Sequence, residues 1–414
     1  MPVEIMNYLE GFADREAAIR KIAEVDEAAF GEGFTEEHIS SPILGVLDDD
    51  RTFLAWEGDE VVGVSANFSL DVSVPGGSVP TAGVTFIGVR PTHRRRGVMT
   101  SMLDNLHADG LRRNEPMAAL WAADPAIYPR FGYGCASRLM RTVIQRAHGT
   151  LSGAPEDPSL RLRMLNSSDD YDLTQPLYAE VRDERGGVPA IDERWHARQT
   201  WDPPSQREGA SALYTVVVED DTGIRGFMRY NLKPEWTAAH DDGTFQIYRM
   251  MSRDPAAQAA LWRYALSFDL MSKVSWSNAP IDDPIQLWLT HPRHATRQLE
   301  DALYVRLLDL PSAMTARTYS AECDVVVGVS DARYPENAGR WRITTGRSGA
   351  TFVRTTDPAD LALDIRVLGA AYLGDASLRA FARAGWIEEL RPGALSALDA
   401  SMHSDAPPYC PFIF

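Results

Sequence analysis

The sequence contains little cysteine and few basic residues relative to its acidic ones. Only three of its 414 residues are cysteines, and none of them forms a CxxC pair or another metal-ligand spacing. This composition indicates neither a disulfide framework nor a zinc site. The 58 Asp and Glu residues outnumber the 41 Lys and Arg residues, so the net charge is −17. An acidic surface disfavours nucleic acid and anionic membranes as partners and attracts cationic ligands such as amines.

Further patterns are missing from the chain. No apolar run approaches the roughly 20 residues that a membrane helix needs. The first residues, MPVEIMNYLEGFADREAAIRK, lack the charged-then-apolar order of a signal peptide. We therefore expect a cytoplasmic protein, with secretion by a route that needs no signal peptide as the alternative. The nine histidines include no HExxH spacing, and the chain has neither a GxSxG elbow nor a Walker A loop, so we expect no metal, no serine hydrolase and no P-loop NTPase.

The chain divides into three blocks, residues 1–152, 153–300 and 301–414, for which we expect mixed α/β structure. The predicted elements of the first block are a helix over 17–30, strands over 51–58, 61–70 and 84–89, a helix after Gly97, and a strand over 117–123. A segment rich in glycine, proline and acidic residues, HGTLSGAPEDPSL, then predicts a linker. The second block repeats the order strand, strand, strand, helix, strand in a weaker form.

The third block contains two predicted strands, CDVVVGVS and GRWRITT. Two helical patterns follow them, DPADLALDIRVLGAAYLG and SLRAFARAGWIEEL. The last residues, PPYCPFIF, are apolar, stiffened by proline and free of charged side chains. Most chain ends are frayed and solvated, but because this one is apolar we expect it to be buried.

Three consecutive arginines, Arg94, Arg95 and Arg96, stand between a buried strand and an amphipathic helix. A helix N-terminus presents unpaired amides and the positive end of the macrodipole, so it can bind phosphate. Gly97 lets a ligand approach the backbone, and arginine matches the geometry of phosphate oxygens. The junction therefore predicts a pyrophosphate site. The alternative is a solvated loop whose arginines pair with surface carboxylates.

The segment VRPTHRRRGVM resembles the acetyl-CoA pyrophosphate loop of the GCN5-related N-acetyltransferases (GNATs). Arg94, Gly97 and Met99 stand at the R/Q-x-x-G-x-G/A positions, and Met99 departs from the small residue expected there. With AIYPRFGYG (126–134), a linker, a weaker second block and a C-terminal block that ends on phenylalanine, the whole chain is similar to the Eis (enhanced intracellular survival) family. That resemblance implies an α/β (α+β) fold of two tandem GNAT-like domains, the second degenerate, followed by a sterol-carrier-protein-like domain. It also implies a homohexamer.

The resemblance implies that acetyl-CoA lies in a V between the strands at 84–89 and 117–123. The residues it assigns to acetyl-CoA are Ile87, Gly88 and Val89 along the pantetheine, Arg94, Arg95, Arg96, Gly97, Val98, Met99 and Thr100 at the pyrophosphate, and Ala123 and Asp124 on the far wall. The predicted amine contacts are Asp26, Phe30 and Phe86. Expected substrates are aminoglycosides, polyamines and protein lysine side chains.

Two catalytic roles follow from the same resemblance. Tyr128 matches the tyrosine that protonates the leaving CoA thiolate, and the terminal carboxylate of Phe414 matches the proton acceptor. Direct transfer in a ternary complex needs a deprotonated amine and a protonated thiolate, and a tyrosine with a reference pKa of about 10 can donate to charged sulfur. A carboxylate with a reference pKa of about 3.5 must act through water or by proximity. Without the resemblance, Tyr128, Phe131 and Tyr133 would be interpreted as a packing cluster. The alternative function for the whole chain is a non-catalytic acyl-CoA sensor or a small-lipid-binding protein.

Overall fold

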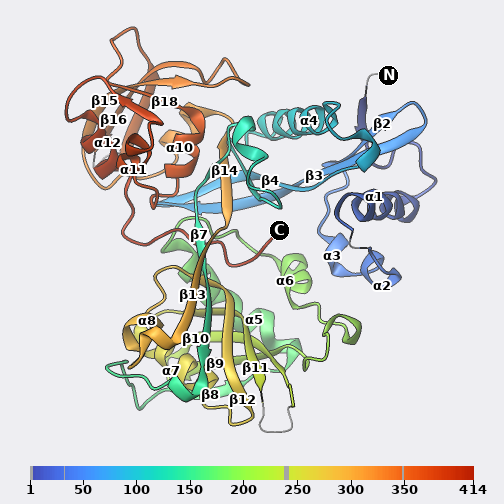
Figure 1. Cartoon of the computed structure of the whole chain (residues 1–414), viewed down its shortest axis with the longest axis vertical. Coiled ribbons are helices and arrows are strands. Elements are labelled where there is room, and N and C mark those ends of the chain that lie inside the picture. The colour runs from blue at the N-terminus through green and yellow to red at the C-terminus, as the bar shows by residue number, and fades with distance from the viewer. Residues whose placement is uncertain (1–2, 32, 237–241, 347–348) are drawn as a thin grey trace.

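The computed structural model describes residues 3–31, 33–236, 242–346 and 349–414, and Figure 1 shows them as three β-sheets with their helices. The first sheet has the strand order β1-β2-β3-β4-β5-β14-β6. Its strands are β1 (Glu4–Asn7), β2 (Thr52–Glu57), β3 (Glu60–Val74), β4 (Gly77–Val89), β5 (Met117–Trp121), β14 (Leu303–Leu307) and β6 (Gly134–Cys135). The accompanying helices are α1 (Arg15–Phe30), α2 (Glu36–Ile39), α3 (Pro42–Gly45) and α4 (Val98–Arg112).

Helices cover both faces of the first sheet, α4 on one face and α1 on the other (Figure 1). The central strand β3 is consequently buried along most of its length, as expected for a strand packed on both faces. The helix α1 begins at Asp14, whose carboxylate accepts a hydrogen bond from the Ala17 amide, and ends at Gly31 in a left-handed conformation. The helix predicted over 17–30 and the strands predicted for this block are confirmed.

The second sheet has the order β13-β7-β12-β11-β10-β9-β8. Its strands are β13 (Ala295–Asp301), β7 (Arg138–Gln145), β12 (Met271–Pro280), β11 (Gly243–Ser252), β10 (Gly223–Lys233), β9 (Tyr214–Asp220) and β8 (Arg161–Met164). Its helices are α5 (Asp170–Asp183), α6 (Glu193–Thr200), α7 (Pro255–Leu266) and α8 (Ile285–Trp288). The repeated order predicted for this block is confirmed by β9, β10, β11, α7 and β12.

The first two sheets exchange strands. The strand β7 lies within the first block in sequence but pairs with β12 and β13 of the second sheet. The strand β14 follows the second block and pairs with β5 and β6 of the first sheet. The division of the chain at residues 152 and 300 therefore does not coincide with the division into sheets, because periodicity along a chain does not record which distant strands pair.

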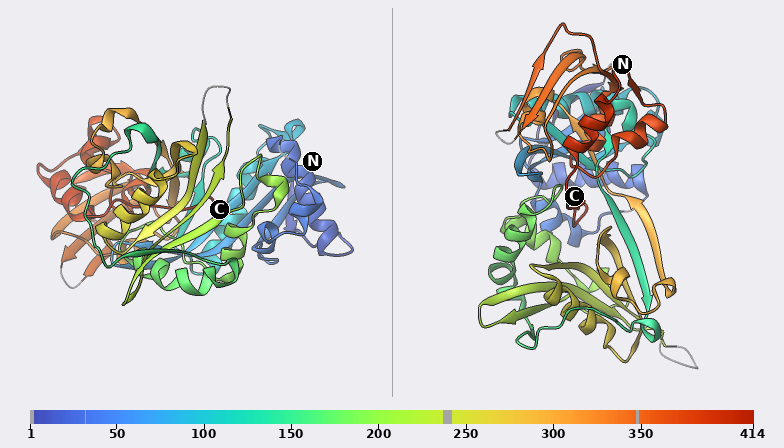
Figure 2. Two further views of the ribbon diagram at one scale, coloured as in Figure 1. Left: turned by 90° about the horizontal axis from the view of Figure 1, so that it is seen from below. Right: turned by 90° about the vertical axis from the view of Figure 1, so that its left-hand side faces the viewer.

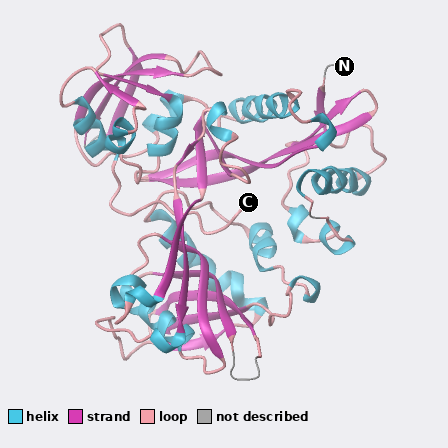
Figure 3. Ribbon diagram, viewed as in Figure 1, coloured by secondary structure: helices cyan, strands magenta, loops and turns pink. Residues whose placement is uncertain are grey.

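The third sheet has the order β17-β16-β15-β18-β19, and its helices lie together beside it (Figure 3). Its strands are β17 (Gly349–Arg354), β16 (Gly339–Gly346), β15 (Cys323–Ser330), β18 (Leu361–Asp364) and β19 (Ile387–Glu389). Its helices are α9 (Leu310–Thr315), α10 (Ile365–Ala371), α11 (Leu378–Arg383) and α12 (Ala394–Met402).

The two helical patterns of the third block are only partly helical in the structure. The first begins as β18, and the chain turns helical at Asp364, whose carboxylate accepts a hydrogen bond from the Arg366 amide and caps α10. The second ends as helix at Arg383, because Gly385 takes a positive φ of 78°, and the chain continues as β19. Short strands that alternate buried and half-buried residues next to a helix start are easily read as part of that helix.

Candidate active site

The strands β4 and β5 lie side by side over a short distance and then separate. They pair in parallel at Thr81 with Met117, Ala82 with Ala118 and Gly83 with Ala119, and no later pair of the two strands occurs in the part of the chain that the structure describes. The stretch Val84–Val89 of β4 therefore has one edge without a strand partner. This is the V that the sequence predicted, although it opens after Ala119 rather than at the start of β5.

A β-bulge distorts β4 where the V opens. Ala66 of β3 pairs with Thr85, and Val64 pairs with Gly88, so β4 contains one extra residue. Phe86 has a positive φ of 50°, which is strained for a bulky residue and occurs mainly at functional sites. The bulge re-aims the backbone of Ile87 and Val89 along the open edge. The sequence analysis missed it, since β-bulges have no reliable sequence signal without a glycine.

The helix α4 begins with free amides. Its N-cap is Gly97, with φ 88° and ψ −3°, which has no side chain to accept a hydrogen bond from the first turn. Arg95, two residues earlier, also has a positive φ of 63°. An uncapped helix N-terminus behind a left-handed loop is suited to a phosphate group, and a Cβ placed on Gly97 would meet no atom within 4 Å, so the approach is open.

The three arginines before this helix differ in their contacts. Arg94 Nη2 donates to the backbone oxygen of Ala29 in α1 at 2.9 Å. Arg96 pairs with Glu57, which also lies 3.0 Å from His93 Nε2. For the Arg95 side chain, the described residues provide no hydrogen bond or ion pair. The sequence left open that these arginines only pair with surface carboxylates. This alternative holds for Arg96 but not for Arg95.

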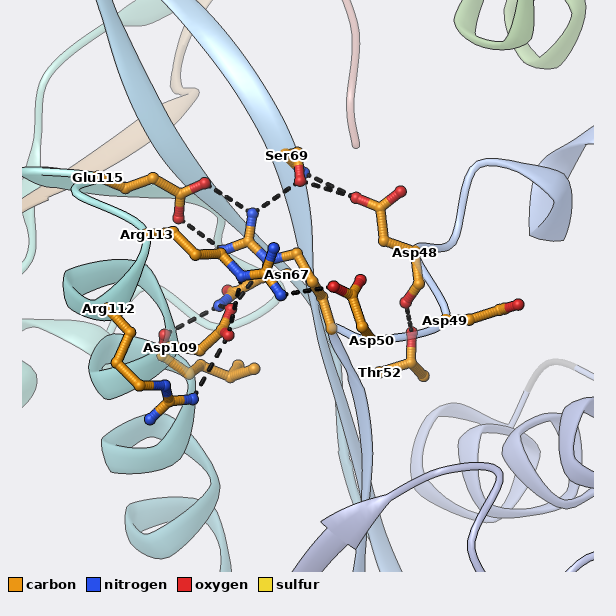
Figure 4. A network of polar contacts seen from close by, with 12 residues as sticks. Asp48, Asp49, Asp50, Thr52, Asn67, Ser69, Asp109, Arg112, Arg113 and Glu115 are labelled. Carbon is orange, nitrogen blue, oxygen red and sulfur yellow. Dashed lines mark hydrogen bonds and ion pairs between the residues drawn. The ribbon is translucent and has the colours of Figure 1, made fainter.

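A buried ionic network fixes α4 to the sheet (Figure 4). The fully buried Arg51 donates to Asp109 of α4 at 2.8 Å and to both carboxylate oxygens of Glu115 at 2.7 and 2.6 Å. Asn67 of β3 donates to Asp109 at 3.2 Å and to the Leu106 oxygen at 2.9 Å. Burial alone would raise the pKa of Asp109, but the charge of Arg51 and several hydrogen bonds lower it. Burial raises the pKa of Glu115. The network holds α4, the helix that begins directly after Gly97.

Tyr128 starts the short 3-10 helix η2 (Tyr128–Phe131) that follows β5. Its side chain is 7% exposed, and its ring packs edge-on against Tyr133 with 5.9 Å between centroids. The Tyr133 hydroxyl is hydrogen-bonded to His107 Nε2 at 2.8 Å. Within the described residues the Tyr128 hydroxyl has no hydrogen-bond partner, and its oxygen is not fully buried. The rings of Tyr128, Phe131 and Tyr133 all belong to one buried cluster, so the packing interpretation holds for each ring. The Tyr128 hydroxyl is in addition available to a ligand.

The turn before Tyr128 is shaped by Asp124. Its Oδ1 accepts a hydrogen bond from the Ala126 amide at 2.9 Å, and its backbone oxygen accepts one from the Ile127 amide at 3.2 Å. Ala123 and Asp124 are exposed at the end of β5, on the side of the V opposite Val84–Val89. Burial, and secondarily the charge of Asp124, raises the pKa of Tyr128 to about 12, so this phenol stays protonated at neutral pH.

A pocket of about 340 Å³ lies at the end of α1 and is lined by Asp26, Phe30, Gly33, Phe34 and His38. The third predicted amine contact, Phe86, lies against Phe34 with 6.3 Å between ring centroids. The Phe30 ring lies 3.7 Å from where a Cβ of Gly88 in β4 would stand. The structure therefore gathers all three predicted residues. The sequence analysis missed His38, for which the available signal was the T-x-x-H spacing of the capping box that starts α2.

The predicted burial of the C-terminal segment is confirmed. Of residues 408–414, only Ile413 is exposed, at 68%, and Phe414 is 5% exposed. Phe414 belongs to a cluster of buried apolar side chains that includes Trp195, with Phe86 of the bulge packed against it. The chain ends between the first and second sheets in both Figure 1 and Figure 2.

Comparisons with known proteins agree with this arrangement. Residues 14–136 match a family model described as an acetyltransferase (GNAT) domain, residues 187–307 match a second acetyltransferase (GNAT) domain model, and residues 310–411 match a sterol carrier protein domain. An uncharacterised N-acetyltransferase of Streptomyces avermitilis is 42% identical over 88% of this chain and 90% of its own length. The N-acetyltransferase Eis of Mycobacterium tuberculosis is 30% identical over 87% of each chain. The crystal structure of Eis1 from Mycobacterium abscessus superimposes with a TM-score of 0.83 at 27% identity, with 100% of both chains covered.

The fold, the uncapped N-terminus of α4 and the matching family models thus define an acetyltransferase of the GNAT class. The chain belongs to the Eis family of N-acetyltransferases. Its expected fold, two GNAT domains followed by a sterol-carrier-like domain, is confirmed. Acetyl-CoA is the acetyl donor of this class. The relatives are acetyltransferases, not non-catalytic acyl-CoA sensors or lipid carriers. The assignment of individual residues to acetyl-CoA, amine and catalysis stays a prediction.

Two kinds of feature are missing from the described residues. No group of three or more His, Cys, Asp and Glu side chains there could hold a metal ion. None of the helices described is both long and apolar enough to cross a membrane.

Proposed function

We propose that this acetyltransferase moves the acetyl group of acetyl-CoA directly to an amine of an aminoglycoside, a polyamine or a lysine side chain, within a ternary complex. The observation that carries the proposal is the position of Phe30, whose ring belongs to the aromatic, acidic pocket and lies 3.7 Å from where a Cβ of Gly88 in β4 would stand. An amine held in that pocket would lie next to the strand edge along which the pantetheine of acetyl-CoA is expected.

The pocket has the chemistry of an amine site. Asp26 supplies a carboxylate, and Phe30 and Phe34 supply ring faces, which attract an ammonium group electrostatically. The chain as a whole carries a net charge of −17, so a cationic substrate would be attracted at long range as well.

Tyr128 is the proposed proton donor to the departing thiolate. Its hydroxyl has no hydrogen-bond partner within the described residues, and its pKa of about 12 keeps it protonated across the working range. A phenol with so high a pKa is a weaker acid than a thiol. It therefore acts by donating a hydrogen bond to sulfur as negative charge develops, and transfers the proton late.

The proposed proton acceptor is the carboxylate of Phe414, on the strength of the family resemblance. Its support is that Phe414 is buried and that the chain ends between the first and second sheets. A carboxylate in such surroundings could draw a proton from an ammonium group by proximity or through one water. The homohexamer is likewise a proposal, which rests on the resemblance alone and is testable by light scattering in solution.

The deciding experiment measures free thiol released from acetyl-CoA by the untagged protein, with kanamycin, neomycin, spermidine or a lysine peptide as acceptor. Release that depends on the amine, with acetylated product seen by mass spectrometry, supports the proposal and ranks the substrate classes. Release without any amine would mean hydrolysis, and acetyl-CoA binding without release from any of the four would contradict the proposed substrates. Tyr128→Phe should lower kcat at least about a hundredfold with the Kd for acetyl-CoA unchanged.

A further inference from the structure

The second GNAT unit keeps the cleft geometry of the first. Its β11 and β12 pair in parallel from Gly243 with Met271 to Ile247 with Trp276, and then separate. A β-bulge again lies at the opening: Tyr230 of β10 pairs with Ile247, and the next residue back, Arg229, pairs with Arg249. Each unit thus has two diverging strands with a bulge in the first of them.

The phosphate end of the second cleft is already filled. The N-cap of α7 is Asp254, whose carboxylate accepts hydrogen bonds from the amides of Ala256 at 2.9 Å and Ala257 at 3.0 Å. Arg225 donates to the same carboxylate at 2.7 Å. At the corresponding place in the first unit stands Gly97, which leaves the amides of α4 free. A side-chain anion therefore takes the place that a pyrophosphate would need.

The open part of the second cleft is filled by the C-terminal segment of the same chain. On the β12 side, the Tyr409 hydroxyl donates to the Asn278 oxygen at 2.7 Å, and Asn278 Nδ2 donates to the Cys410 oxygen at 3.1 Å. On the β11 side, the buried guanidinium of Arg249 lies 5.2 Å from the centre of the Phe412 ring. Arg249 and Asn278 each stand two residues beyond the last paired residues of their strands. The segment consequently lies between the two diverging strand ends.

We propose that the former cofactor cleft of the second unit is a binding site for the segment Tyr409–Phe412, and that Arg249 and Asn278 are positioning residues which place Phe414 at the first unit. The second half of this statement rests on the proposed role of the Phe414 carboxylate. Further contacts tighten the same site: the Tyr409 amide donates to the Gly186 oxygen at 2.9 Å, and Phe412 packs against Trp195.

Two hydrogen bonds constrain the backbone of the segment, one from β12 and one within the segment itself. The Asn278 amide holds the Cys410 oxygen, and the Cys410 thiol donates to the Phe412 oxygen at 3.3 Å. Phe414 follows after the single exposed residue Ile413. Phe414 lies only two positions beyond Phe412. The contacts that hold the Phe412 ring therefore limit where Phe414 can lie.

The first test uses the full chain and the variant Asn278→Ala. Its matched control is Asn231→Ala on β10, since Asn231 is also an asparagine of the second sheet but donates to Tyr248, not to the segment. Carboxypeptidase should release Phe414 from Asn278→Ala about tenfold faster than from the control, and kcat should fall about fivefold at an unchanged KM for acetyl-CoA. These values correspond to the loss of about one net hydrogen bond. Equal release and equal kcat in the two variants would overturn the proposal.

The second test separates the binding site from the catalytic role. A chain that ends at Pro408 is titrated with the synthetic peptide YCPFIF, once with a free carboxylate and once as the C-terminal amide. Both peptides should bind with similar Kd, both should bind at least about fivefold more weakly after Asn278→Ala, and only the free acid should restore turnover. If both bind and neither restores turnover, the cleft site stands and the Phe414 base is wrong.

Failure of both peptides to bind, in a shortened chain that still melts cooperatively and binds acetyl-CoA, would overturn the cleft site itself. If the shortened chain does not fold, the carboxypeptidase comparison of the two full-length asparagine variants decides the question alone.

Discussion

We predict that Arg94, Arg95 and Arg96, which precede α4, contribute unequally to acetyl-CoA binding. Arg94 and Arg96 already bond to Ala29 and Glu57, whereas Arg95 has no such contact within the described residues, and its backbone φ of 63° is strained. A side chain kept free at a strained position next to an uncapped helix is available for the pyrophosphate. Replacing Arg95 by alanine should therefore remove a charge-assisted hydrogen bond without disturbing the fold.

Such a bond contributes about 1.5–3 kcal/mol when both partners are well ordered. Arg95 is exposed, and solvent screening reduces the value to about the lower end of this range, which is roughly tenfold in Kd. Arg95→Ala should raise the Kd for acetyl-CoA by about that factor in calorimetry at low salt, and by less at high salt. Arg96→Ala should have a smaller effect on the Kd, because its guanidinium is shared with Glu57.

The control is a donor without the pyrophosphate, acetyl-pantetheine. Arg95→Ala should leave kcat/KM for acetyl-pantetheine unchanged, because the proposed partner of Arg95 is missing from that substrate. An equal loss with both donors would show that the substitution damages the V or Tyr128 and would refute the reasoning. An unchanged Kd for acetyl-CoA would mean that Arg95 is only a solvated surface residue.

Three further predictions concern the scaffold. Gly97→Ala should cost about 1 kcal/mol of stability in urea denaturation and weaken acetyl-CoA binding, because its φ of 88° disfavours an L-residue although the added Cβ meets no atom. Arg51→Met should cost about 3–5 kcal/mol, because it leaves the buried Glu115 without an ion pair and removes the shortest ion pair of the buried Asp109. The partly exposed Arg113→Met should cost less than about 1 kcal/mol, because Asp109 keeps Arg51; equal costs would contradict the buried network. Burial raises the pKa of Asp283 from 3.8 to about 6. The stability that this group contributes is therefore fully present below the pKa of the unfolded chain and is lost as the pH rises through the pKa of the folded protein. Asp283→Asn should therefore flatten the profile of melting temperature across that pH window.

Elements whose signal is local in sequence were predicted well. The strand CDVVVGVS is β15 residue for residue, and the helix predicted over 17–30 is α1 with two further residues. The junction that we predict to bind pyrophosphate has the expected local structure for the same reason, since strand end, arginines, glycine and helix start follow one another directly. Tyr128 and Phe414 depended on the family resemblance, because nothing local distinguishes them from packing aromatics.

Features that depend on contacts between distant parts of the chain were missed. The exchange of β7 and β14 between the sheets joins residues more than a hundred positions apart, and a hydrophobic pattern contains no record of such pairing. The network around Arg51 has the same character: Arg51 and Glu115 are ordinary charged residues in sequence, and only the fold makes them a buried pair. The contact between Asn278 and Cys410 joins residues 132 positions apart and has no local signal either.

The two GNAT units show which features belong to the fold and which decide its ligand. Both units have the diverging strands and the bulge, so these follow from how a parallel pair separates and do not by themselves mean cofactor binding. The difference lies at the helix start, where Gly97 leaves amides free and Asp254 consumes them. A carboxylate at that point repels a pyrophosphate and satisfies the same donors, so a single residue type suffices to close a cofactor site. The closed cleft still contains a backbone acceptor, the Asn278 oxygen, and the Tyr409 hydroxyl of the C-terminal segment satisfies it.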